Sequence, residues 1–174
     1  SFQDGCKINV HISGKQGPNG IRRALPRLSQ EARNLITIEN DEMGHGLDAS
    51  LELEKDLALV LDIHHHWIRD EEYIQATDDR VKRVIDSWRG QRPTLHYSYS
   101  RDEHLAVAGL GDSTHTQMHD IKDLLARGCK KQKLRAHSDL LPNRAVNDWA
   151  LTFLQNFDIQ TEAKGKNMAQ EQLY

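Results

Sequence analysis

Histidines and acidic residues stand at or near the ends of five short apolar runs in this sequence. In chain order they are His11, Glu39, Asp62 with His64 and His65, His96, and Glu162. Imidazole nitrogens and carboxylate oxygens together suit Mn²⁺, Fe²⁺ or Zn²⁺, whereas Mg²⁺ and Ca²⁺ favour shells made almost wholly of oxygen. Paired divalent ions lower the pKa of a bound water, orient it for attack and neutralise charge on a leaving oxygen. The pattern therefore indicates a metal site for phosphodiester hydrolysis, although sugar isomerases use similar ligands.

Each of these residues also has a plainer interpretation when it is taken alone. A single histidine or acid at a strand end more often makes a local hydrogen bond or caps a helix than binds a metal. The tract His64-His65-His66 could be a solvent-facing turn. Histidines or acids that end five successive strands are harder to explain locally, so we favour a shared metal site.

The runs that carry these residues are expected to be strands that lead into loops. Their ranges are 8–13, 35–41, 57–65, 94–98 and 158–164. A sixth candidate, 133–139, is mostly polar and is either a short strand or an ordered loop. Because active-site residues of parallel α/β barrels gather at the carboxyl ends of the strands, these ends are where the site is expected.

Helical patterns separate the runs. The clearest helix is expected to begin at Thr77 or Asp78, either of which could cap it. Its apolar positions repeat at helical spacing and are Val81, Val84, Ile85 and Trp88. Similar patterns cover 146–154 and 21–28, whereas 98–133 is expected to be a long loop with one short helix near 121–125. The alternation predicts an α/β fold with a parallel sheet and helical crossovers.

Length and composition set limits on this architecture. The 174 residues fit one domain, but a complete (β/α)8 barrel takes roughly 250. No run of about 18 apolar residues and no signal-peptide pattern is present, so a soluble, cytoplasmic protein without a membrane partner is expected. Cys6 and Cys129 stand far apart, which favours ordinary thiols. The net charge of −3 gives no overall attraction to a polyanion, so nucleic-acid binding would depend on local clusters or bound metal ions.

Five short motifs occur in a fixed order along the chain. They are Ile38-Glu39-Asn40-Asp41-Glu42, Asp62-Ile63-His64-His65, His96-Tyr97-Ser98, Arg135-Ala136-His137-Ser138-Asp139 and Glu162-Ala163-Lys164-Gly165-Lys166. Together with His11-Ile12-Ser13-Gly14 they resemble the UV damage endonuclease family, and the likeness extends to Leu173. The resemblance implies a metal-dependent DNA-repair endonuclease that cuts damaged double-stranded DNA next to ultraviolet photoproducts. It also implies a (β/α) TIM-type barrel related to apurinic-site nucleases and sugar isomerases.

The resemblance assigns roles to individual residues. The positions that match family metal ligands are His11, Glu39, Asp62, His65, His96, His137 and Glu162. The ions implied are divalent, commonly Mn²⁺, with Mg²⁺, Zn²⁺ or Fe²⁺ as alternatives, and the expected catalytic carboxylates are Glu39, Asp62 and Glu162. His64 and His66 are then neighbours of the site and not ligands. Residues 40–42 are expected at the rim of the site, as are Lys164 and Lys166, and the two lysines are expected to meet DNA phosphates there.

Two departures from the family stand out. Thr94 occupies the position, two before His96, where the family often carries a lysine that can be modified and help bind metal. The family's N-terminal strands have no counterpart, so residues 1–174 are expected to form a single, incomplete barrel domain of about five to six strands. An open barrel leaves sheet edges and apolar inner surface uncovered. The chain is therefore expected to aggregate, to pair with a second copy or to need the missing N-terminal part.

Two other functions are open from the sequence. One is an apurinic-site nuclease or sugar isomerase of the same superfamily. Detection of nicked DNA would indicate a nuclease, and formation of a ketose would indicate a sugar isomerase. The other is a truncated barrel that binds metal or DNA without turnover. The Glu-Ala-Lys-Gly-Lys segment that begins at Glu162 favours the UV damage endonuclease.

Overall fold

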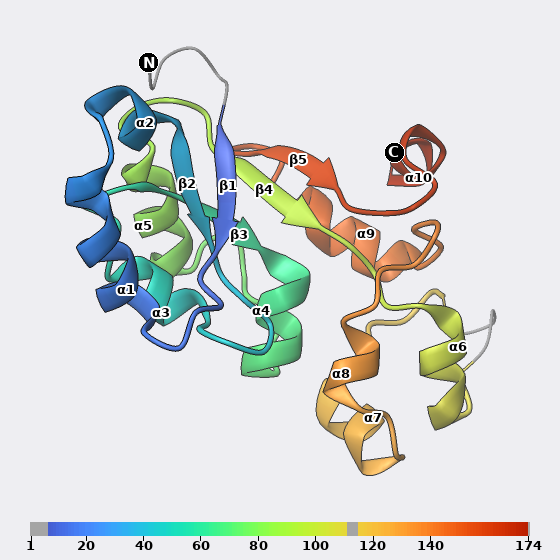
Figure 1. Ribbon diagram of the computed structural model, residues 1–174. Helices are drawn as coiled ribbons and strands as arrows, with labels where there is room; N and C mark the ends of the chain where they lie inside the picture. Colours follow the sequence, from blue (N-terminus) through green and yellow to red (C-terminus); the bar gives the residue numbers. More distant parts are fainter. Residues whose placement is uncertain (1–6, 111–114, 174) are drawn as a thin grey trace.

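A parallel sheet forms the centre of the computed structural model, which describes residues 7–110 and 115–173. Its strands are Ile8–His11 (β1), Ile36–Glu39 (β2), Ala58–Asp62 (β3), Thr94–Tyr97 (β4) and Asp158–Thr161 (β5). They lie in the order β1-β2-β3-β4-β5, and each is parallel to the next (Figure 1). Strand order that follows chain order is the arrangement of a (β/α) barrel wall. Within the described residues β1 does not pair with β5, so the sheet is open.

Helical segments connect the strands. Those between β1 and β2 are Gly17–Ala24 (α1), the 3₁₀ turn Leu25–Arg27 (η2) and Gln30–Leu35 (α2). Leu47–Leu51 (α3) precedes β3, and Ile63–Asp70 (α4) and Asp79–Ser87 (α5) follow it. Between β4 and β5 lie Asp102–Leu105 (α6), Ala106–Ala108 (η3), Ile121–Ala126 (α7), Lys131–Leu134 (α8) and Arg144–Leu151 (α9). Asn167–Leu173 (α10) follows β5. In the described part of the chain, no helix is long and apolar enough to cross a membrane.

The α5 helix forms where its apolar pattern predicts it. Asp78 is the N-cap, and its carboxylate accepts a hydrogen bond of 2.8 Å from the backbone N–H of Arg80. Val81 is fully buried on the apolar face of the helix. Trp88, directly after the helix, donates its indole N–H to the Leu59 carbonyl of β3 at 2.6 Å. The helix is thereby held against the middle of the sheet.

The two faces of the sheet differ in polarity. Leu59, Leu61, Leu95 and Tyr97 alternate along β3 and β4 and are fully buried in the main core. The opposite face carries the chemistry-bearing residues, because residues two apart in a strand share a face. Its members include Asn9, His11, Thr37, Glu39, Asp62, Thr94, His96 and Gln160.

The apolar part of the polar face is covered, contrary to expectation. Ala58 and Val60 lie below Asp62 on that face and are buried against Trp88. Exposed apolar side chains occur instead on the edge strand β1, where Ile8 is 56% and Val10 38% exposed. The open edge therefore presents apolar surface at one strand only among those described.

Two expected boundaries were wrong, and the segment 133–139, for which a short strand and an ordered loop were both open, is not a strand. The run at 57–65 ends as a strand at Asp62, because this residue caps α4 by accepting a hydrogen bond of 2.7 Å from the backbone N–H of His65. The histidine tract is therefore helical and buried, and not a solvent-facing turn. The candidate at 133–139 forms no sixth strand: it begins in α8 and continues to a single bridge between Ser100 and His137. The segment 98–133 contains α6, α7 and part of α8 where one short helix was expected.

Candidate metal centre

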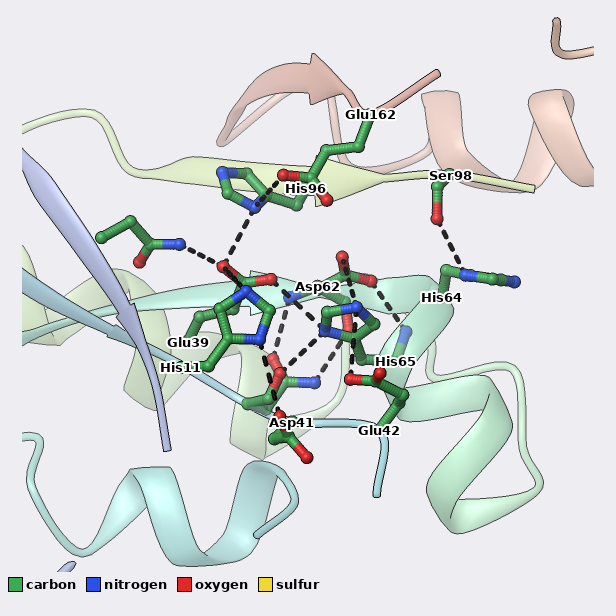
Figure 2. A network of polar contacts seen from close by, with 12 residues as sticks. His11, Glu39, Asp41, Glu42, Asp62, His64, His65, His96, Ser98 and Glu162 are labelled. Carbon is green, nitrogen blue, oxygen red and sulfur yellow. Dashed lines mark hydrogen bonds and ion pairs between the residues drawn. The ribbon is translucent and has the colours of Figure 1, made fainter. Parts of the chain in front are cut away.

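The candidate site lies at the carboxyl ends of the strands, on the polar face of the sheet. Pairing of β1 with β2 sets His11 beside Glu39, and pairing of β3 with β4 sets Asp62 beside His96. Their side chains and that of His65 turn toward one another (Figure 2). Glu162 completes the cluster from the chain that follows β5. The structure therefore brings together the six residues expected to converge.

Glu39 is the centre of this cluster and is fully buried. Its Oε2 lies 3.5 Å from His11 Nε2 and 3.2 Å from His96 Nδ1, and its Oε1 lies 3.3 Å from His65 Nδ1. Burial raises the pKa of Glu39, but the neighbouring imidazoles of His65 and His96 outweigh it and hold the pKa well below its usual range. Such a carboxylate would supply a ligand atom to a divalent ion held among these histidines.

Asp62 and His65 form the second part of the cluster. His65 Nε2 lies 3.5 Å from Asp62 Oδ2. Burial raises the pKa of Asp62 to about 6, although His65 acts in the opposite direction. Burial lowers the pKa of His65, but the carboxylates of Asp62, Glu39 and Glu42 outweigh it and raise the value to about 10. Without a metal, a protonated imidazole thus supplies the positive charge between these acids.

His96 and Glu162 close the side of the cluster that faces solvent. His96 Nδ1 lies 3.2 Å from Glu162 Oε1, and the Glu162 side chain is 26% exposed. One potential ligand atom from each of Glu39, Asp62, His96 and Glu162 lies within 4.8 Å of the others. His137 is more distant, with Nδ1 3.9 Å from Glu162 Oε2. It stands at the margin of the cluster and belongs to none of the compact ligand groups among the described residues.

Several buried polar atoms in the cluster lack a hydrogen-bond partner among the described residues. They are Glu39 Oε1, Glu42 Oε2, Asp62 Oδ2 and His96 Nδ1. A buried polar atom without a partner costs about 1–3 kcal/mol, and more where the group is charged. Glu39, Asp62 and His96 belong to one group with ligand spacing, so a divalent ion held there would satisfy polar atoms of several of these residues at once. The donor set is mixed imidazole and carboxylate, which fits Mn²⁺, Fe²⁺ or Zn²⁺.

Asp41 and Glu42, expected at the rim, lie buried beside the cluster. Asp41 Oδ1 accepts hydrogen bonds from the backbone N–H groups of Met43 and Gly44, which leaves Oδ2 3.6 Å from His11 Nδ1. Glu42 Oε2 lies 3.6 Å from His65 Nε2. These two acids and His11 form a further group with ligand spacing. The sequence signal was present, since both acids follow Glu39 with only Asn40 between, but the turn that folds them inward could not be inferred from it.

Asn40 has a structural role that spacing alone did not indicate. Its side chain donates to the Asp62 carbonyl at 2.9 Å and accepts from the Asp62 backbone N–H at 2.8 Å. The Asn40 carbonyl lies 2.9 Å from His65 Nδ1, where an imidazole N–H can donate to it. Asn9, also missed, donates through its side chain to Glu39 Oε2. Both asparagines hold candidate ligands in position, as the outer partners of metal ligands do.

His64 and His66 face partners outside the cluster. His64 Nδ1 lies 2.8 Å from Ser98 Oγ, and its Nε2 lies 3.1 Å from Ser100 Oγ. Burial lowers the pKa of His64 well below its usual range. His66 Nδ1 lies 2.9 Å from Asp70 Oδ2. The i, i+1 and i, i+2 positions on a helix point in different directions, which explains why only the middle histidine of α4 reaches the cluster.

Lys164 and Lys166 are exposed in the loop after Glu162. Lys164 Nζ lies 3.7 Å from Asp139 Oδ1, and Lys166 has a left-handed backbone with a φ of 52°. An open hollow of about 670 Å³ is lined by Lys164, Glu162 and His137 among others. Lys164 thus stands at the exposed side of the candidate site, and Lys166 follows it in the same loop.

Comparison with known proteins places the chain in a family. Residues 3–174 match the family described as UV-endonuclease UvdE. The chain is 29% identical over 105 residues to the UV-damage endonuclease of Neurospora crassa, across 51% of this chain and 16% of that protein. It is 24% identical over 179 aligned positions to a putative UV-damage endonuclease of Acanthamoeba polyphaga mimivirus, across 96% of this chain and 52% of that protein.

A solved structure agrees with this grouping at the level of fold. The crystal structure of SacUVDE matches with a TM-score of 0.64 and 19% identity, across 94% of this chain and 48% of that chain. The chain thus spans about half the length, or less, of the relatives it matches. The resemblance inferred from the five ordered motifs is confirmed by the match over nearly the whole chain. The protein belongs to the UV-endonuclease UvdE family.

Proposed function

We propose that this chain supplies the metal-binding wall of a DNA-repair endonuclease that hydrolyses a phosphodiester next to ultraviolet photoproducts in duplex DNA. The observation that carries the proposal is the convergence of histidines and carboxylates from all five strand ends around the buried Glu39 and Asp62, where several polar atoms lack a hydrogen-bond partner among the described residues. Membership of the UV-endonuclease UvdE family supports the class of substrate.

The residues proposed to hold divalent ions, most simply Mn²⁺, are His11, Glu39, Asp62, His65, His96, His137 and Glu162. Such ions, when bound, would lower the pKa of a water molecule and neutralise charge on the leaving oxygen. Mg²⁺ is the weakest alternative, because it prefers oxygen ligands and this set holds several imidazoles. Fe²⁺ and Zn²⁺ suit the same donors.

The carboxylates Glu39, Asp62 and Glu162 have different tasks in this proposal. Glu39 and Asp62 are fully buried and set the charge and geometry of the cluster. Glu162 is partly exposed and lines the open hollow, so it is the carboxylate that a DNA strand in that hollow would meet first. Lys164 and Lys166 would meet phosphate as point charges at the same rim.

The open edge of the sheet is the proposed place for a further partner. Ile8 and Val10 of β1 expose apolar side chains beside unpaired backbone groups, a surface that additional barrel strands or a second copy of the chain would cover. Light scattering of the chain and of a Val10→Lys variant tests the second copy. A dimer that becomes a monomer in the variant supports self-pairing, and a monomeric wild-type chain contradicts it.

Nicking of supercoiled plasmid tests the proposed reaction. Irradiated plasmid should be nicked in the presence of Mn²⁺, with far less nicking in EDTA or on unirradiated plasmid. Glu162→Gln should remove the activity, whereas Glu171→Gln, an exposed glutamate on α10, should not. Equal nicking by the Glu162→Gln variant would contradict the assignment. Plasmid with apurinic sites and a ketose substrate, assayed in parallel, separate the other reactions of the superfamily.

A further inference from the structure

A segment with strong positive charge lies outside the metal centre. Residues 127–135, here called the basic segment, contain Arg127, Lys130, Lys131, Lys133 and Arg135 and no acidic residue. The chain as a whole carries a net charge of −3, so this concentration departs from its average. A run of charges is often only a solvated surface, but it can also be a binding surface. Its position in the fold decides between these two interpretations.

Two ion pairs hold the basic segment, one with an acid beside the metal centre and one with the carboxyl end of α4. Arg135 Nε lies 2.5 Å from Glu42 Oε1, and the other oxygen of Glu42 faces His65. Lys131 Nζ lies 2.8 Å from Glu71 Oε1, at the carboxyl end of α4. Figure 1 shows α8 beyond the carboxyl ends of the strands, on the side toward which β4 points. The segment is therefore anchored at the edge of the candidate site.

The anchoring leaves other charges of the segment free. Lys130 and Lys133 are exposed, and neither has an ion-pair partner among the described residues. Lys130 is the N-cap of α8 and Lys133 lies within it, and Leu134, directly after Lys133, is fully buried and fixes the helix against the core. Arginine on the outer helix α1 is different, because Arg22 is neutralised by Glu52 and Asp56. Lys130 and Lys133 are thus unneutralised cations in a segment that Arg135 ties to an acid of the metal centre.

The metal centre creates a need for such cations. Five carboxylates gather there, from Glu39, Asp41, Glu42, Asp62 and Glu162, and they repel a polyanion that approaches the site. Cations that flank an acidic site offset this repulsion and supply the phosphate contacts on which duplex affinity mainly depends. We infer that the basic segment binds the phosphate backbone of duplex DNA beside the metal centre, through Lys130 and Lys133. This inference rests on the proposed function, since it names a second surface for the same substrate.

Binding of undamaged duplex in EDTA tests the inference without any cleavage. Fluorescence anisotropy of a short labelled duplex, titrated at a series of NaCl concentrations, gives the dependence of affinity on salt. Lys130→Ala with Lys133→Ala should reduce the slope of log affinity against log salt by about 1.8, since each duplex phosphate contact contributes about 0.9. If the variant and the wild-type chain bind equally at 1 M salt, this difference in slope makes the Kd of the variant about 30-fold higher near 0.15 M salt.

Two further variants serve as controls. Lys55→Ala with Lys82→Ala removes two exposed lysines, one before the amino end of β3 and one on α5, and should leave the slope unchanged. Lys130→Arg with Lys133→Arg should keep the wild-type slope, and thermal melts should show equal stability for all variants.

The outcomes separate this inference from the proposed function. An unchanged slope in the Lys130→Ala, Lys133→Ala variant, an equal loss in the Lys55→Ala, Lys82→Ala control, or no duplex binding by the wild-type chain overturns the inference. A reduced slope in a chain that does not nick irradiated plasmid supports the phosphate surface and contradicts only the proposed reaction. An unchanged slope in the Lys130→Ala, Lys133→Ala variant, together with normal nicking of irradiated plasmid by the wild-type chain, supports the proposed reaction and contradicts the phosphate surface.

Discussion

Replacement of Glu39 by glutamine gives the sharpest test of the candidate metal centre. The substitution keeps the shape of the side chain and removes a charge that lies at 3.2–3.5 Å from three imidazoles. An amide does not balance the charge of divalent ions and is a weaker ligand than a carboxylate. Loss of an outer partner of a ligand lowers metal affinity about 10–100-fold, so loss of the ligand itself should lower Mn²⁺ affinity more than about 100-fold. Titration calorimetry with Mn²⁺ measures this directly.

The metal-free protein should also lose stability. Removal of one partner from a buried charge pair costs about 3–5 kcal/mol. The lower end applies here, because Glu39 also raises the pKa of Asp62, so its removal relieves a repulsion. A loss of about 3 kcal/mol corresponds to a decrease in Tm of about 6–12 °C for a domain of this size. Urea unfolding in EDTA gives the free energy independently.

The pH dependence supplies a further check on the Glu39→Gln variant. The pKa of Glu39 is lowered from 4.5, so its contribution is fully present above that pH and is lost as the pH falls through the folded value. Its partner His65 stays protonated until about pH 10. The stability difference from wild type should therefore be largest between about pH 5 and 6.5, and should shrink both in acid and as the pH rises toward 10. Glu171→Gln is the matched control, and wild-type Mn²⁺ affinity in Glu39→Gln would refute the reasoning.

Four other results are expected. Glu162→Gln should keep the circular dichroism spectrum and lose Mn²⁺ affinity at least about 10-fold, and an unchanged affinity would remove Glu162 from the ligands. Asn40→Ala should lower the free energy of unfolding by about 2–3 kcal/mol in urea, because both hydrogen bonds to the Asp62 backbone are lost. Mn²⁺ binding at pH 7 should release about one proton from His65, whose pKa is about 10, and calorimetry in two buffers detects it. The pKa of His65 is raised, so its contribution to metal-free stability should be present below pH 6.5 and lost as pH rises toward 10; a flat profile there would contradict that pairing.

The sheet and most of the cluster could be predicted because they depend on local rules. Alternation along a strand places Glu39 and Thr37 on one face, and the same rule places Leu59 and Leu61 on the other. The cap at Asp78 follows from residue type and the apolar pattern after it. Parallel strands then gather their carboxyl ends without further information.

Other features depend on contacts between distant parts of the chain, which no local pattern reports. The Arg135–Glu42 ion pair joins α8 to the loop after β2 across most of the chain. The bridge between Ser100 and His137 fixes the chain after β4 in the same way. Asn40 replaces a pair of backbone hydrogen bonds to Asp62, and that role becomes visible only once the register of β2 and β3 is known.

Asp62 shows how one residue can serve the fold and the site together. Its Oδ1 accepts the backbone N–H of His65 and starts α4 at that point. The residue three positions into a helix lies close to its N-cap, so the imidazole of His65 returns to the side of the cap, and its Nε2 lies 3.5 Å from Asp62 Oδ2. The hydrogen bond to Oδ1 of Asp62 fixes the carboxylate, and this directs its Oδ2 toward the candidate metal centre. The Asp-x-x-His spacing is thus both the reason that the strand ends and the reason that two candidate ligands meet, which explains why a boundary placed at residue 65 was wrong while the pairing of the two residues was expected.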